Sequence, residues 1–139
     1  MDASGRLRWL RAVLFVGVVY LVAGISFAAL ANRVASAQMR VTWRLAAWVI
    51  SAAAFAAHIG YEQVRLGSSP GTTAVHTSWA VALGAFALAV AANVHAQAVS
   101  SYQPSHAVAL VAWPVLTALP AFGVALAAAA GLARARRTD

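Results

Sequence analysis

Residues 11–31 read RAVLFVGVVYLVAGISFAALA, an apolar run that carries no charged side chain after Arg11. A helix rises about 1.5 Å per residue, so a run of this length is sufficient to cross the roughly 30 Å hydrocarbon core of a bilayer. The stretch therefore predicts a transmembrane helix.

Three further stretches have the same character, at residues 43–63, 74–97 and 106–133. The connecting segments are short, which favours antiparallel neighbours. Ser105 is expected to cap the last helix, because serine is a favoured N-cap residue. The sequence therefore predicts an all-α integral membrane four-helix bundle, running up-down-up-down with short loops, as a single transmembrane domain over residues 1–139.

Composition supports a membrane protein. Hydrophobic residues make up 63% of the chain and charged residues 9%, against about 25% charged in soluble domains. Cysteine is absent, which excludes disulfides, thiolate catalysis and cysteine metal sites. The net charge of +7 comes from arginines that flank the apolar runs rather than lining one folded face. We therefore expect a lipid bilayer as partner and no nucleic acid.

The arginines also predict the orientation. If the N-terminus is cytoplasmic, seven arginines lie on the inner side (Arg6, Arg8, Arg11, Arg65, Arg134, Arg136 and Arg137) and three on the outer side (Arg33, Arg40 and Arg44). The positive-inside rule then places both termini in the cytoplasm of a bacterial inner membrane. The alternative is a signal peptide cleaved near Ala35-Ser36-Ala37. The first apolar run exceeds the usual 7–15 residues of a signal peptide, so we expect it to be retained.

The four histidines form two pairs by predicted depth. His58 and His76 lie near the ends of the second and third spans that face the cytoplasm, and His95 and His106 lie at the opposite side. Facing histidines on neighbouring helices suit the two axial ligands of haem b. Histidine is also at home at a membrane interface, where no cofactor is needed. We expect no cofactor, and keep haem b as the alternative.

One face of the second span carries most of its polar residues. Ser51, His58, Glu62 and Arg65 follow one another at spacings of seven, four and three, which places them on one side of a helix. Glu62 is the only acidic residue away from the chain ends. The face indicates either a proton-handling or ligand-binding site, or a helix-terminal ion pair between Glu62 and Arg65.

Small residues recur on the first and last spans. Gly17 and Gly24 are seven apart, and Gly123 and Gly131 are eight apart with Ala127 between them. Such faces allow close helix packing in membranes. We therefore expect a homo-oligomer or a larger membrane complex.

No nucleotide-binding, zinc-binding or nucleophile–base motif is present in the sequence. Pro114 and Pro120 are expected to kink the last span, which can then line a pocket for an apolar ligand. The function predicted is a non-enzymatic oligomeric or accessory subunit of a membrane complex. The alternatives are an electron-transfer subunit that binds haem b or quinone, and a small oligomeric permease.

Overall fold

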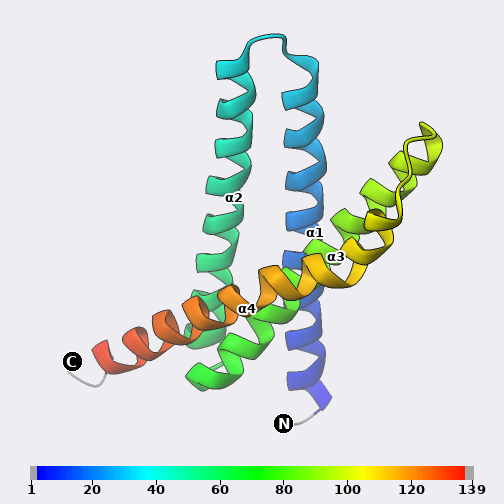
Figure 1. Ribbon diagram of the computed structural model, residues 1–139. Coiled ribbons are helices and arrows are strands. Elements are labelled where there is room, and N and C mark those ends of the chain that lie inside the picture. Colours follow the sequence, from blue (N-terminus) through cyan, green and yellow to red (C-terminus); the bar gives the residue numbers. More distant parts are fainter. Residues whose placement is uncertain (1–2, 137–139) are drawn as a thin grey trace.

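The computed structural model describes residues 3–136, which form four helices joined by short loops (Figure 1). The helices are α1 (Ala3–Arg33), α2 (Ala37–Val64), α3 (Pro70–Ala98) and α4 (Pro104–Ala135). Each predicted span lies inside one of them, and all four are long and apolar enough to cross a membrane. The predicted all-α, four-helix membrane fold is confirmed. Arg137, one of the arginines in the charge count, lies outside the described residues.

Local sequence explains where three of the helices begin. Ser36 and Ser69 are the N-caps of α2 and α3. The hydroxyl of each accepts a hydrogen bond from the backbone N–H three residues later in the chain. The N-cap of α4 is Gln103, whose backbone N–H donates to His106 Nδ1 at 3.1 Å. The prediction of Ser105 as the cap is wrong, because Pro104 already occupies the first helical turn, where proline is favoured.

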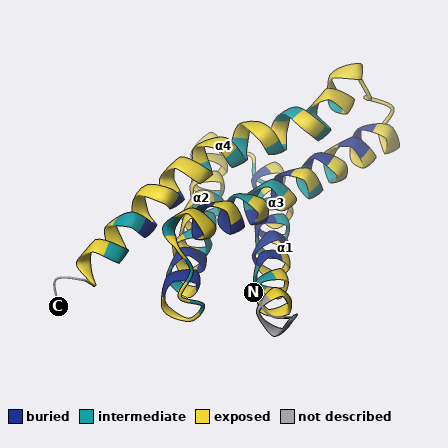
Figure 2. Ribbon diagram, turned by 90° about the horizontal axis from the view of Figure 1, so that it is seen from below, coloured by how far each residue is buried: buried dark blue, intermediate teal, exposed yellow. Residues whose placement is uncertain are grey.

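Consecutive helices form two antiparallel hairpins, α1–α2 and α3–α4. The second hairpin is steeply inclined to the first, so that α3 and α4 run obliquely across the lower part of α1 and α2 (Figures 1 and 2). α3 packs against both α1 and α4, whereas α1 and α4 make no pairing within residues 3–136. The start of α1, the α2–α3 loop and the end of α4 lie toward one end of the molecule, and the α1–α2 loop lies at the other (Figure 1).

The crossing of α1 and α3 depends on glycine. A Cβ atom placed on Gly84 would lie 2.7 Å from Tyr20 Cβ, and one placed on Gly24 would lie 2.6 Å from Leu88 Cδ2. Gly17 also faces α3, with Leu83 Cβ at 3.4 Å from the corresponding position. The small residues of the first span therefore pack inside the chain. Around Gly123 and Gly131 on α4, by contrast, no described atom lies within 4 Å of such a Cβ.

The largest fully buried side chains of this protein are polar, which is unusual for a protein interior. These are Glu62, Thr73 and Thr77, while most of the buried apolar residues are alanines. Large apolar side chains lie outside, including Trp48 at 76% exposure and Phe15 at 70%. Exposed residues cover much of every helix (Figure 2). This distribution suits a protein whose outer surface contacts lipid tails, which are as apolar as leucine.

Candidate functional site

Two features mark the interior: a buried polar cluster at the end of α2, and an apolar cavity between the four helices. The cluster is centred on Glu62, whose side chain is fully buried. One carboxylate oxygen, Oε1, lies 3.0 Å from His76 Nδ1, and the other, Oε2, accepts a hydrogen bond from the Ser68 hydroxyl at 2.6 Å. A buried carboxylate needs such partners, because leaving it unpaired is costly.

The loop that follows α2 builds this environment. Gly67 takes a left-handed conformation at φ 61°, which turns the chain sharply and which glycine adopts without strain. Ser68 N–H then donates to the Glu62 carbonyl at 3.1 Å. The Gln63 amide nitrogen donates to the Ser68 carbonyl at 3.0 Å and to Thr73 Oγ1 at 2.7 Å. The loop therefore wraps around the end of α2 and holds Glu62 against the start of α3.

The other helices complete the enclosure. The Trp9 ring on α1 lies 4.7 Å from the His76 ring, measured between centroids, at an interplanar angle of 37°. At the end of α4, the Arg136 guanidinium donates to the Gln63 carbonyl at 2.8 Å. All four helices thus meet at the polar cluster.

His58 is the least satisfied member of the cluster. It is 2% exposed, and within residues 3–136 neither ring nitrogen has a hydrogen-bond partner. Its Nε2 lies 3.8 Å from Glu62 Oε1, too far for a hydrogen bond. A buried polar group without a partner costs about 1–3 kcal/mol. His58 is thus the member with capacity for a further hydrogen bond.

The structure places the sequence-derived site residues in different surroundings. His58, Glu62 and His76 come together, whereas Arg65 is exposed and forms no ion pair with Glu62 among the described residues. Ser51 lies on the same face of α2 but eleven residues from Glu62, and it lines the apolar cavity instead.

The two histidine pairs also differ. His58 and His76 both approach the same oxygen of Glu62, so the carboxylate stands between the two imidazoles. His106 caps α4 and stacks on Tyr102 with ring centroids 5.6 Å apart. His95 is exposed, and no ring contact or hydrogen bond joins it to His106 in the described chain. Among residues 3–136, no group of three or more His, Asp or Glu has an arrangement that could hold a metal ion.

Sequence reasoning missed the partners that close the cluster, namely Ser68, Gln63 and Thr73. A signal for them was present. The short Gly67-Ser68-Ser69-Pro70 turn reverses the chain directly after Glu62, so the polar residues at the start of α3 had to lie opposite the end of α2.

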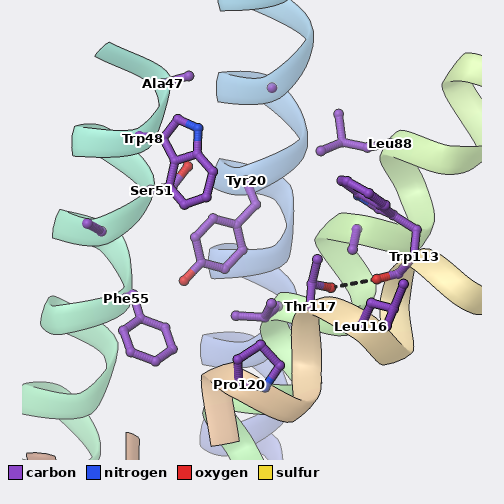
Figure 3. Close-up of a pocket in the computed structure, with 14 residues that line it drawn as sticks. Tyr20, Ala47, Trp48, Ser51, Phe55, Leu88, Trp113, Leu116, Thr117 and Pro120 are labelled. Atoms are coloured by element: carbon purple, nitrogen blue, oxygen red, sulfur yellow. Dashed lines mark hydrogen bonds between the residues drawn. The ribbon is translucent and has the colours of Figure 1, made fainter. Parts of the chain in front are cut away.

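The second feature is a cavity of about 550 Å³ between the two hairpins (Figure 3). Its walls come from all four helices and are mainly hydrocarbon and aromatic. The lining residues are Tyr20, Gly24, Ala47, Trp48, Ser51, Ala52, Phe55, Val81, Ala85, Leu88, Trp113, Leu116, Thr117 and Pro120. Small-molecule sites in proteins have volumes of about 300–1,000 Å³ and a similar apolar lining.

Few polar atoms face this cavity. Figure 3 shows the Thr117 hydroxyl turned back onto its own helix, where it donates to the Trp113 carbonyl at 2.9 Å. The Tyr20 side chain extends from α1 into the space between α2 and α4 (Figure 3). Tyr20 is 9% exposed, and its buried hydroxyl has no hydrogen-bond partner within the part of the chain that the structure describes. The hydroxyl thus leaves one hydrogen bond unmade beside the cavity that the Tyr20 side chain lines.

A smaller cavity of about 240 Å³ adjoins the first on the side of the α1–α2 loop. The two cavities share Gly24, Ala47 and Trp48 as wall residues. The smaller one is more polar because Asn32 and Arg44 line it.

Comparison of the chain with protein-family models, with curated proteins and with solved structures gives no match. The four-helix membrane fold and the two interior features are therefore the basis for a functional conclusion.

Proposed function

We propose that this integral membrane protein is non-enzymatic and binds an apolar, membrane-soluble molecule in the cavity between its two hairpins. The observation that carries the proposal is the cavity of about 550 Å³. It is walled by all four helices and lies among residues near the middle of each span. Its few polar groups suit retention of a ligand better than bond-making chemistry.

The proline-containing helix supports this assignment. Pro114 and Pro120 lie inside the continuous helix α4, and Pro120 lines the cavity with Trp113 and Leu116. A proline in a helix interior removes a backbone hydrogen bond and bends the helix. Irregular backbone inside a membrane is tolerated where protein covers it or where it lines a cavity. The proline-containing segment of α4 thus lies at the wall of the cavity, where the backbone carbonyls freed by proline are tolerated.

The test uses an uncharged, heavy-atom-labelled chain, methyl dibromostearate, which quenches tryptophan fluorescence on contact. The protein is placed in phosphatidylcholine nanodiscs and titrated with the ester. We expect saturable quenching that is reduced in Trp48→Phe, because Trp48 lines the cavity. Ala52→Phe, which fills the cavity, should abolish the saturable component. Ala53→Phe is the matched control, since Ala53 is the neighbouring exposed residue and is not part of the lining. Identical, unsaturable quenching in all variants would refute cavity binding.

A quinone is the second candidate ligand, and the unpartnered Tyr20 hydroxyl favours it. A quinone carbonyl is an acceptor that this donor suits, as in an electron-transfer subunit. Tyr20→Phe removes the donor and keeps the ring, so quinone affinity should fall about tenfold. Unchanged affinity would argue against this candidate. For haem b, His58 and His76 would both have to turn away from Glu62, so a Soret band in the purified protein is its test.

Assembly with further subunits is also proposed, and α4 is the helix that supports it. Within the described chain α4 buries Ala125 and Ala129, whereas Gly123, Ala127 and Gly131 are exposed. A small-residue face of this kind allows another transmembrane helix to approach closely.

A further inference from the structure

We infer that the ligand is a single-chain amphipathic acid whose hydrocarbon chain occupies the large cavity and whose anionic head is bound by Arg44 and Asn32. The inference rests on the proposed function and specifies the ligand class. The ligand is then a long-chain acid that enters from the surrounding membrane. Three observations support it: the two cavities adjoin, the positive charge at the smaller one has no acidic partner among the described residues, and the two together are long enough for a hydrocarbon chain.

The two cavities adjoin along α1 and α2. Gly24, Ala47 and Trp48 are wall residues of both, so the polar space beside Arg44 borders the apolar space directly. Polarity changes in one direction along this path. Asn32 and Arg44 line the smaller cavity, whereas Phe55 and Leu116 line the larger one. A ligand that fits both must itself be polar at one end and apolar at the other.

Arg44, which lines the smaller cavity, forms no ion pair with an acidic residue in the part of the chain that the structure describes. The chain contains three acidic residues, Asp2, Glu62 and Asp139. Glu62 is buried near the opposite end of α2, where His76 and Ser68 hold it. Within the described residues, ion-pair contacts with carboxylates involve histidines and not Arg44. The planar guanidinium of arginine binds carboxylate and phosphate oxygens through paired hydrogen bonds. Arg44 therefore offers an oxyanion site at the mouth of an apolar cavity.

The surroundings strengthen this charge. Arg33 ends α1 and Arg40 lies one turn before Arg44 on α2, so three arginines gather at the α1–α2 loop. The chain places three cations at this end with no acidic residue among them. An anionic head beside Arg44 would offset part of their mutual repulsion.

The depth suits a hydrocarbon chain. Arg44 lines the smaller cavity and Phe55 lines the larger one, eleven residues further along α2. At 1.5 Å per residue, the two adjoining cavities together extend about 16 Å along the helix. A hydrocarbon chain bound there would contact Trp48, Trp113 and Leu88, which line the larger cavity.

The experiment compares two molecules that differ in one charge: dibromostearate and its methyl ester. Both are titrated into the protein in phosphatidylcholine nanodiscs, at a pH where the acid is ionised, and quenching of tryptophan fluorescence is measured. We expect the acid to bind about tenfold more tightly than the ester, and Arg44→Gln to remove this difference. Arg44 is exposed, so the substitution leaves the packed interior intact. Arg40→Gln is the matched control, since Arg40 lies at the same end but lines neither cavity.

Each other outcome has a distinct meaning. Equal binding of acid and ester, with no effect of Arg44→Gln, overturns the head-group assignment and leaves the cavity proposal standing. Equal loss in Arg40→Gln and Arg44→Gln shows general attraction of anions to a basic surface, which overturns a specific site. Displacement by phosphatidic acid but not by unlabelled stearate identifies a two-chain lipid and overturns the single-chain acid. Absence of saturable quenching by either probe refutes the proposed function itself.

Discussion

The Nδ1 atom of His76 lies 3.0 Å from Oε1 of Glu62, and this contact joins the start of α3 to the end of α2 beside a fully buried carboxylate. The two residues are fourteen apart in sequence and are brought together by the turn at Gly67. The contact fixes the point from which the second hairpin departs across the first.

Replacement of Glu62 should therefore destabilise the protein. A rim ion pair would lose about 0–1 kcal/mol in Glu62→Gln, but the buried carboxylate has close partners in His76 and Ser68. We expect a loss of about 1–3 kcal/mol in the free energy of unfolding, because the amide is uncharged and has one accepting oxygen where the carboxylate has two. Denaturant titration in detergent micelles measures it. Arg65→Gln is the control, and its exposed side chain predicts a change within about 0.5 kcal/mol. A loss of 1 kcal/mol or less in Glu62→Gln would mean that the cluster is not a structural determinant.

The two histidines of the cluster should respond differently to substitution. His58 has no hydrogen-bond partner in the described chain, so His58→Phe removes an unsatisfied buried group and should be neutral or stabilising within about 1 kcal/mol. His76→Phe should destabilise, because it leaves one Glu62 oxygen without its nearest partner. Thermal unfolding of both variants under one condition makes the comparison. If His58→Phe is the more damaging variant, His58 has a partner that the geometry does not reveal.

Glycine substitutions should separate packing within the chain from packing between chains. Gly84→Leu and Gly24→Leu place bulk against Tyr20 and Leu88, so both should weaken the α1–α3 crossing and lower thermal stability. Gly123→Leu meets no described atom within 4 Å, so the monomer should retain its stability. If α4 forms an interface, Gly123→Leu should shift the assembly size in native-like lipid. A monomeric wild type, or an unaltered assembly in Gly123→Leu, would contradict that interface.

The distribution of arginines predicts the orientation in the membrane. A reporter enzyme that is active only outside the cytoplasm should be silent when fused after Asp139. The same reporter placed at Ser101, in the α3–α4 loop, should be active. The imbalance of seven arginines against three supports this orientation. Activity of the fusion after Asp139 would overturn it.

The sequence was sufficient to predict the helices, because each apolar run is long enough to cross a membrane and short polar turns separate the four runs. The predicted starts came too late in every helix, by eight residues in α1, six in α2, four in α3 and two in α4, because polar residues precede each apolar run inside its helix. Loop length gives the antiparallel hairpins but not the angle between them. That angle depends on side chains such as Tyr20 and Gly84, which are distant in sequence and meet only once the helices cross.

The candidate site was predictable to a smaller degree. Helical spacing placed His58 and Glu62 on one face of α2, and the structure confirms that both are buried there. The same spacing grouped Ser51 and Arg65 with them. Helical periodicity gives the side of the helix on which a residue lies, but not how deeply the residue is buried or which other helix packs against it. Ser51 lines the cavity and Arg65 is exposed just beyond the end of α2, whereas His58 and Glu62 between them are buried by the neighbouring helices.

The inclination of the second hairpin has a consequence for the surrounding bilayer. α4 contains 32 residues, a length of about 48 Å against a hydrocarbon core of roughly 30 Å. A helix longer than the core matches it by tilting, and the two hairpins cannot both stand along the membrane normal when one crosses the other obliquely. The mismatch between helix length and bilayer thickness therefore differs between the two hairpins. A thicker bilayer favours a more upright α3–α4 pair, which alters the crossing angle and with it the width of the cavity between the hairpins.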